Sequence, residues 1–213
     1  MKVFFWFLCF LPIVYAAGTY DYFQLVQQWP PTYCNVSGGS TCSSPLKFTI
    51  HGLWPSDSSK TQAPKCTGSP FDSTKISNLK SNLRNDWPDL NGNHERFWRY
   101  EWEKHGTCSE TKYDQLQYFR TALTLKKKID ILDTLVKANI KPDTVARYES
   151  SKITAAIQQK TGFTPRLWCK NGKLLEISFC VNTSLADMHC PSVLLNYQLN
   201  VCQGKVQFPD KVA

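Results

Sequence analysis

One stretch of the chain gathers the residue types that acid–base chemistry requires. It is FWRYEWEKHGTC, residues 97–108, and it contains Glu101, Lys104 and His105. On an α-helix these three residues stand at i, i+3 and i+4, so we expect their side chains to project from one face. The spacing therefore predicts a patch of one carboxylate, one ammonium and one imidazole, surrounded by aromatic rings.

A second stretch adds another imidazole. FTIHGLWPS, residues 48–56, contains His51 and, three residues later, Trp54. If this stretch is a strand, His51 lies on the same face as the polar residues Lys47 and Thr49, and the aliphatic side chains lie on the other face. Two histidines beside a cation and aromatic faces are suited to acid–base chemistry on an anionic polymer that carries bases.

Cleavage of RNA without a metal is the reaction that fits these groups. It needs a base for the proton of the ribose 2′-OH and an acid for the departing 5′-oxygen. Histidine suits both roles because its ordinary pKa lies near 6.5. Lys104 is placed to stabilise charge on the phosphoryl oxygens. Glu101 has three open roles: orienting the histidine, holding Lys104, or hydrogen-bonding the phosphorane.

Other interpretations of these residues receive less support. His94 and His189 have no comparable setting and are expected to be structural or surface residues, and Trp98 and Trp102 are expected in the core. No G-x-S-x-G segment indicates serine hydrolysis, and no C-x2-C pair indicates zinc. The rival from another class is a non-catalytic basic glycoprotein that recognises a partner.

The beginning of the chain is typical of a secreted protein. Residues 1–17 have a charged start, an uncharged apolar run and small residues at 16–18, which predicts a signal peptide. No later stretch is long and apolar enough to cross a membrane, so no membrane association is expected. The formal net charge of +8 favours polyanionic partners such as nucleic acid.

The cysteines and sequons agree with export. Eight of the nine cysteines follow the signal, and an even number indicates a disulfide framework. Asn35 and Asn182 begin N-x-S/T sequons and are the predicted glycosylation sites.

The pattern of the remaining residues predicts a single α+β domain, with a central, mostly antiparallel sheet packed by several helices and stapled by disulfides. Strands are expected near both ends of the chain and helices between them. The expected strands are 20–29, 46–53, 166–169, 174–181, 196–201 and 206–208, and the expected helices are 73–83, the segment at 97–108, 113–125, 129–138 and 148–161.

The two stretches together resemble the active-site signatures of the T2 ribonuclease family, secreted endoribonucleases that need no metal or other cofactor. HGLWPS and FWRYEWEKHGTC stand in the family's order, and the opening strand, cysteine pattern and length of residues 18–213 agree with it. The resemblance implies that His51 is the general acid and His105 the base. It also implies that Glu101 and Lys104 stabilise the phosphorane on the way to a 2′,3′-cyclic phosphate.

The resemblance extends to substrate binding, with two departures. Trp54 matches a residue of the first base pocket and Phe97 one of the second, which Gln28 also lines. Tyr100 stands where many members have a third histidine that assists phosphate binding, so weaker substrate affinity is expected. Ser56 stands where many members have a base-contacting aspartate.

These departures, the charge and the sequons make the chain similar to the plant pistil branch, the S-ribonucleases of gametophytic self-incompatibility. That branch implies an RNA substrate, a pollen-side recognition protein of the F-box type and a monomeric enzyme. An S-like ribonuclease of phosphate salvage, senescence or defence is the alternative. The family's disulfides imply the pairs Cys34–Cys42, Cys66–Cys108, Cys169–Cys202 and Cys180–Cys190.

Overall fold

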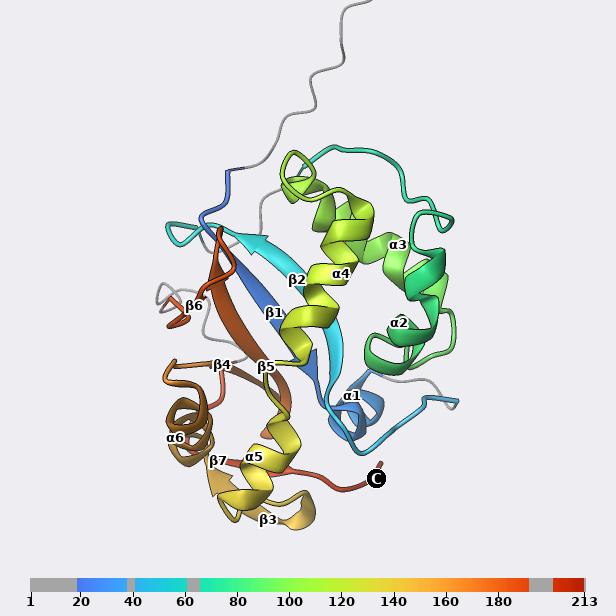
Figure 1. Cartoon of the computed structure of the whole chain (residues 1–213). Helices are drawn as coiled ribbons and strands as arrows, with labels where there is room; N and C mark the ends of the chain where they lie inside the picture. The colour runs from blue at the N-terminus through green and yellow to red at the C-terminus, as the bar shows by residue number, and fades with distance from the viewer. Residues whose placement is uncertain (1–18, 38–40, 61–65, 192–200, 213) are drawn as a thin grey trace, which may run out of the picture.

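The computed structural model describes residues 19–37, 41–60, 66–191 and 201–212 (Figure 1). The predicted signal peptide lies outside these residues, and so does the predicted strand 196–201 except for Val201, which forms an isolated antiparallel bridge with Trp168.

A mixed sheet forms the centre of the described chain. Its strands follow the order β2-β1-β5-β7-β3, with β4 and β6 each paired to β5. All pairings are antiparallel except the one between β5 and β7, so the predicted mostly antiparallel sheet is confirmed. The strands are β1 (Tyr22–Gln28), β2 (Thr49–Ser56), β3 (Asp143–Glu149), β4 (Arg166–Lys170), β5 (Lys173–Asn182), β6 (Asp187–Met188) and β7 (Lys205–Phe208).

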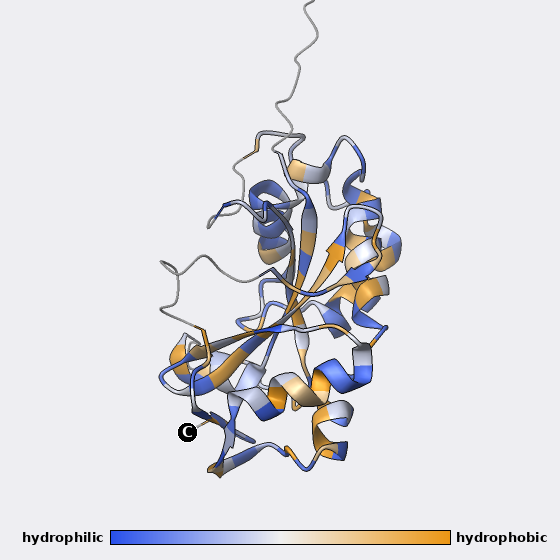
Figure 2. Cartoon of the chain, turned by 90° about the vertical axis from the view of Figure 1, so that its left-hand side faces the viewer, coloured by the Kyte–Doolittle hydropathy of each residue, from blue (hydrophilic) through white to orange (hydrophobic). Residues whose placement is uncertain are grey.

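Two groups of helices pack against the sheet. In Figure 1, α2, α3 and α4 lie beside β1 and β2, whereas α5 and α6 lie at the end that holds β3 and β7. In Figure 2 the helices carry both hydrophilic and hydrophobic residues, as expected when one face is buried. The helices are α1 (Pro30–Val36), α2 (Lys80–Asp86), α3 (His94–Lys104), α4 (Gln115–Lys126), α5 (Ile131–Lys137) and α6 (Ser150–Thr161), with 3-10 turns at Ser77–Leu79 and Gly106–Ser109.

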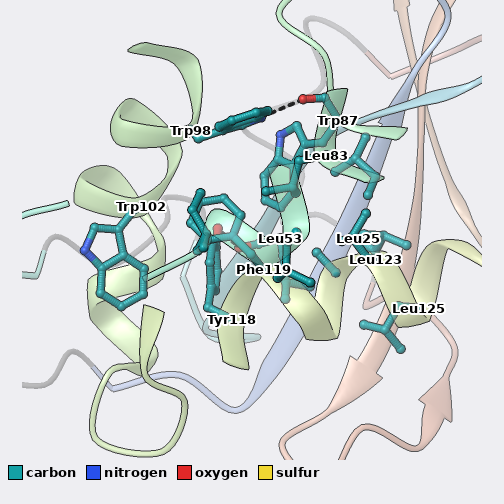
Figure 3. Close-up of a cluster of buried hydrophobic side chains, with 14 of the residues drawn as sticks. Leu25, Leu53, Leu83, Trp87, Trp98, Trp102, Tyr118, Phe119, Leu123 and Leu125 are labelled. Carbon is teal, nitrogen blue, oxygen red and sulfur yellow. Dashed lines mark hydrogen bonds between the residues drawn. The ribbon is translucent and has the colours of Figure 1, made fainter. Parts of the chain in front are cut away.

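Each helix group has its own hydrophobic core. The core beside β1 and β2 includes Trp87, Trp98 and Trp102, all fully buried, so the prediction that the last two are core residues is confirmed. The indole N–H of Trp98 donates to the backbone carbonyl of Trp87 (Figure 3). This bond satisfies a polar group that would be costly to bury alone, and it fixes α3 against the end of α2.

The element boundaries differ from the predictions in several places. No helix was predicted directly after the strand 20–29, but the segment after Trp29 forms α1, since a proline at the first helical position is preset for a helix. The first residues of the predicted helix 148–161 belong instead to the edge strand β3. Strand β6 was not predicted, and α2 begins several residues after the predicted start at Ser73.

The four disulfides implied by the family resemblance are all present, which confirms those pairings. Cys66–Cys108 joins the loop after β2 to the turn that follows α3, so it connects the two segments that carry the histidines. The other pairs are Cys34–Cys42, Cys169–Cys202 and Cys180–Cys190.

Candidate active site

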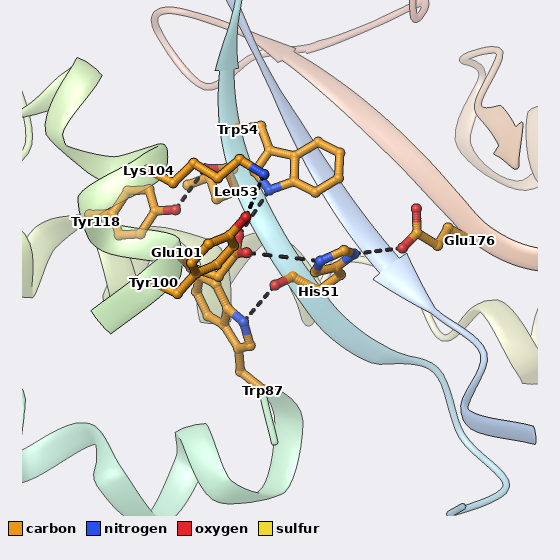
Figure 4. Close-up of polar contacts among 9 residues, drawn as sticks. All are labelled: His51, Leu53, Trp54, Trp87, Tyr100, Glu101, Lys104, Tyr118 and Glu176. Carbon is orange, nitrogen blue, oxygen red and sulfur yellow. Dashed lines mark hydrogen bonds and ion pairs between the residues drawn. The ribbon is translucent and has the colours of Figure 1, made fainter. Parts of the chain in front are cut away.

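A β-bulge places His51. Strand β2 pairs with β1 such that Ile50 faces Gln27 and Gly52 faces Val26, and the register shifts between Val26 and Gln27. His51 is therefore the extra residue on its strand, and a bulge of this kind re-aims a side chain. The indole N–H of Trp87 donates to the His51 carbonyl at 2.8 Å, which holds the bulge to the adjacent helices (Figure 4).

The His51 imidazole lies between two carboxylates. Its Nδ1 is 2.5 Å from Oε1 of Glu176, and its Nε2 is 3.9 Å from Oε1 of Glu101 (Figure 4). Burial opposes the charged imidazole, as does Lys104, but the attraction of Glu176 and then Glu101 is stronger. The pKa of His51 is consequently raised to about 9. The side chain remains 29% exposed, so the protonated ring is open to a ligand.

Helix α3 supplies the groups opposite His51. The Asn93 side chain accepts a hydrogen bond from the N–H of Arg96, which caps the start of the helix. The helix ends at Lys104, and the N–H of His105 donates to the carbonyl of Glu101. His105 itself has φ −124° and ψ −49°, so it is the C-terminal cap and not a helical residue.

His105 thus follows the helix as its cap, with its N–H still bonded to the turn that carries Glu101. The next residue, Gly106, packs against the ring of Trp102 so tightly that an added Cβ would lie 2.4 Å from it. The chain continues from here as a 3-10 turn. The rings of His105 and Trp54 stack at 5.1 Å with an angle of 27°.

The environment of His105 is the opposite of that of His51. The side chain is only 5% exposed, and its Nδ1 has no hydrogen-bond partner among the residues that the structure describes. Burial, followed by the charges of Lys104 and His51, lowers the pKa of His105 to about 3. Between about pH 3 and pH 9 this imidazole is therefore neutral while that of His51 is charged.

Glu101 is almost fully buried, with 1% of its surface exposed, and one of its oxygens accepts the indole N–H of Trp54 at 2.9 Å. Burial raises the pKa of Glu101, although His51, Trp54 and Lys104 favour its charged form. Gly52 leaves the space for this arrangement: a Cβ there would lie 2.1 Å from the indole nitrogen and 2.2 Å from the carboxylate.

Lys104 lies at the rim of the site. Its Nζ donates to the hydroxyl of Tyr100 at 2.8 Å and is 4.9 Å from the centre of the Tyr100 ring. Tyr100 is 52% exposed, so the lysine and tyrosine form a solvent-accessible pair beside the buried carboxylate. Tyr100 thus holds the ammonium through a hydrogen bond and a cation–π contact.

Of the three residues expected in the base pockets, two are partly exposed beside His51 and one is buried in the sheet. Phe97 and Trp54 both contact the His51 ring, with centres 5.9 Å and 5.1 Å away, and both are partly exposed. Gln28 is buried at the end of β1, where it pairs with Thr49 on one side and Glu176 on the other.

Glu176 is the site residue that sequence reasoning missed. It lies 125 positions from His51, on strand β5. The pairing of β1 with β2 and β5 was needed to bring it beside the histidine, and no local motif encodes that pairing.

Among the described residues, no group of three or more His, Cys, Asp or Glu side chains is arranged to hold a metal ion. Within those same residues, no helix is long and apolar enough to span a bilayer.

The fold and the site define a disulfide-bonded α+β protein with two histidines of opposite protonation, set beside a carboxylate and a cation. Residues 20–190 match the Ribonuclease T2 family, and the chain belongs to that family.

Relatives agree over nearly the whole chain. Ribonuclease 1 of Arabidopsis thaliana is 38% identical over 222 residues, which cover 95% of this chain and 94% of that protein. Ribonuclease S-7 of Nicotiana alata is 35% identical over 184 residues, which cover 82% and 83% of the two chains. The structure of ribonuclease MC1 from bitter gourd seeds superposes with a TM-score of 0.75 at 34% identity, covering 80% of this chain and 94% of that one. A point mutant of that enzyme is known in complex with 5′-GMP.

Proposed function

We propose that this protein is a metal-independent endoribonuclease that cleaves single-stranded RNA by transesterification through a 2′,3′-cyclic phosphate. The observation that carries the proposal is the placement of the two imidazoles, His51 from β2 and His105 after α3, each with its ring centre 5.1 Å from that of Trp54. With a pKa of about 9 for His51 and about 3 for His105, one ring is charged and the other neutral at the same pH. Environments that push two pKa values apart in this way assign the acid and the base.

The reaction uses each group once. Neutral His105 removes the proton of the 2′-OH, the 2′-oxygen forms a bond to phosphorus, and the bond from phosphorus to the 5′-oxygen breaks. Protonated His51 supplies the proton that the 5′-oxygen requires. Lys104 and Glu101 stabilise the pentacoordinate phosphorane between these events.

Substrate binding requires one rearrangement. The Trp54 indole contacts both imidazoles and donates to Glu101, so it lies beside the space that a phosphodiester between the histidines must enter. We expect bound substrate to displace the indole, which then stacks on the first base. Phe97, which is partly exposed next to His51, stacks on the second base, and Gln28 supports that pocket from β1.

The first experiment tests the reaction itself. Purified protein is incubated in EDTA with a ribodinucleotide and its deoxy counterpart from about pH 4 to pH 8. We expect a 2′,3′-cyclic phosphate product from the ribodinucleotide and none from the deoxy compound. Loss of activity in the chelator would overturn the mechanism, and RNA binding without cleavage would favour the non-catalytic glycoprotein.

The second experiment tests the assignment of the histidines. His51→Asn and His105→Asn are each expected to lower kcat by several orders of magnitude while circular dichroism stays unchanged. His189→Asn is the matched control, because this exposed histidine contacts Thr164 and Phe163 away from the site. Turnover near the wild-type rate in either active-site variant would reassign the roles.

We also propose that the enzyme is secreted as a monomer, after removal of residues 1–17, and glycosylated at Asn182 and Asn35. Asn182 is exposed, whereas Asn35 is partly covered and its amide donates to the carbonyl of Lys211. Enzymatic deglycosylation followed by mass spectrometry tests each sequon.

For the biological role we propose that of pistil determinant of self-incompatibility, acting with an F-box protein of the pollen. The net charge of +8, the sequons, Tyr100 and Ser56 support this role, and ribonuclease S-7 is a relative. The higher identity to ribonuclease 1 favours the alternative, an S-like enzyme of phosphate salvage, senescence or defence. Expression confined to the style, with alleles that differ in sequence, is expected for the first role. General expression induced by phosphate starvation would establish the second.

A further inference from the structure

The shortest polar contact of His51, the proposed general acid, is made with Glu176, a residue that has no role in the proposed reaction. Nδ1 of His51 lies 2.5 Å from Oε1 of Glu176, although the two residues are on strands that do not pair with each other. Strand β1 separates them, and its Gln28 pairs with Thr49 of β2 and with Glu176 of β5. The Glu176 side chain therefore crosses β1 to reach the histidine.

The contact orients the ring. An Nδ1–H that is held by a carboxylate cannot also serve a substrate, so the other nitrogen, Nε2, is the one that remains available. Nε2 points toward the groups of α3 and is 3.9 Å from Glu101 (Figure 4). The side chain of Glu176 is only 14% exposed, so water competes little for this bond.

We propose that Glu176 is the positioning residue of the general acid: it forms a carboxylate–imidazole pair with His51 and makes Nε2 the atom that gives its proton to the 5′-oxygen. This assignment rests on the proposed ribonuclease function. Glu176 touches no reacting atom and acts only through the orientation and the charge of the imidazole.

The other charges near His51 do not replace this effect. Glu101, from α3, also attracts the imidazolium, but more weakly than Glu176, and Lys104 from the same helix opposes it. His105 is neutral in this range, and Trp87 contributes only a hydrogen bond to the backbone. Removal of the Glu176 charge therefore leaves burial and Lys104 with much less opposition, and His51 loses its proton at a lower pH.

If Glu176 had only a structural role, its removal would have a different effect on activity. The dependence of activity on pH distinguishes a structural role from a positioning role. If Glu176 only ties the strands together, its loss lowers activity to the same degree at every pH. If it holds the acid in its charged form, its loss matters most at high pH, where the imidazole of the variant is deprotonated.

The test compares Glu176→Gln with the wild type, using kcat/KM for a ribodinucleotide across the pH range. Glutamine keeps the size and a hydrogen-bond acceptor but removes the charge. We expect the alkaline limb to move down from about pH 9 by about two pH units, toward the ordinary range of histidine, so that kcat/KM falls roughly tenfold further at pH 8 than at pH 5. Glu95→Gln removes the same charge at an exposed site paired with Lys80, and its profile should match that of the wild type.

A second measurement does not depend on activity. Titration of His51 by NMR should show a lower pKa in Glu176→Gln than in the wild type, while Glu95→Gln leaves it unchanged. An unmoved alkaline limb with an unmoved His51 pKa overturns the proposal, and so does a loss of kcat/KM that is equal at all pH values. If the wild type cleaves no RNA, the proposed function fails, whereas the titration still decides whether Glu176 governs the charge of His51.

Discussion

Gly52→Ala tests whether the packing around Glu101 is part of the catalytic geometry. Gly52 lies in β2 directly after the bulge at His51, and its backbone does not require glycine, so alanine is accepted by the strand itself. The new methyl group, however, would lie 2.1 Å from Nε1 of Trp54 and 2.2 Å from Oε2 of Glu101, where ordinary contacts begin at 3.4 Å. Both groups must therefore withdraw by roughly 1 Å or more.

The two displacements have different consequences. Trp54 is partly exposed and can turn outward, whereas Glu101 is enclosed and has little space into which to move. A misplacement of about 1 Å in a catalytic group can cost about 10²-fold in rate, which corresponds to about 2.7 kcal/mol of transition-state stabilisation. We expect kcat/KM to fall by about that factor, with a stability loss of about 1–3 kcal/mol from overpacking.

The assay is kcat/KM on a ribodinucleotide together with urea unfolding. Ile50→Val is the matched control, because it removes a methylene from the hydrophobic core in the same strand and is expected to cost about 0.5–1.5 kcal/mol of stability. That variant should keep kcat/KM within about twofold to threefold. A folded Gly52→Ala enzyme with wild-type kcat/KM would refute the role of this packing.

Three further outcomes follow from the charges of the site. Tyr100→His frees Lys104 from the tyrosine hydroxyl and should lower KM several-fold without moving either limb of the pH profile; an unchanged KM would remove Tyr100 from phosphate binding. Because the pKa of His105 is lowered, its contribution to stability is present above pH 6.5 and is lost as the pH falls toward about 3. The slope of about 1.4 kcal/mol per pH unit in this range should diminish in His105→Gln, as urea titrations can show. Binding of long RNA should weaken steeply between about 50 and 200 mM salt, and a salt-independent Kd would mean that the charge of +8 serves another purpose.

Local sequence was sufficient for the parts of the site that lie within single elements. The helical spacing that brings Glu101 and Lys104 together is a property of any α-helix, and α3 has an N-terminal cap that stabilises its start. His105 follows the last helical residue as the cap, so its surroundings also depend on the chain beyond the helix. There Gly106 contacts Trp102, and that contact depends on how the aromatic core packs.

The features that could not be predicted depend on contacts between segments that lie far apart in the sequence. Residues 30–36 contain two prolines and were not predicted as a helix, yet they form α1, which is largely buried. Glu176 shows the same limit at the site, since its partner is two strands away and its role follows from the register of β1 with both neighbours. The connectivity of the four disulfides could be predicted only from the family resemblance, because eight cysteines allow 105 different connectivities.

The asymmetry of the two histidines arises from where each ring sits in the fold. His51 is on the strand face, where a bulge exposes it and a carboxylate from β5 can reach its Nδ1. His105 follows the end of α3, where no carboxylate reaches its buried Nδ1 among the described residues and the neighbouring charge, Lys104, is positive. Identical side chains are thus driven to opposite protonation states, His51 by a carboxylate that reaches it from the sheet and His105 by burial beside the positive charge of Lys104. Exchange of the two roles would require moving a negative charge from the sheet to the helix, so we infer that the direction of proton transfer is set by the fold.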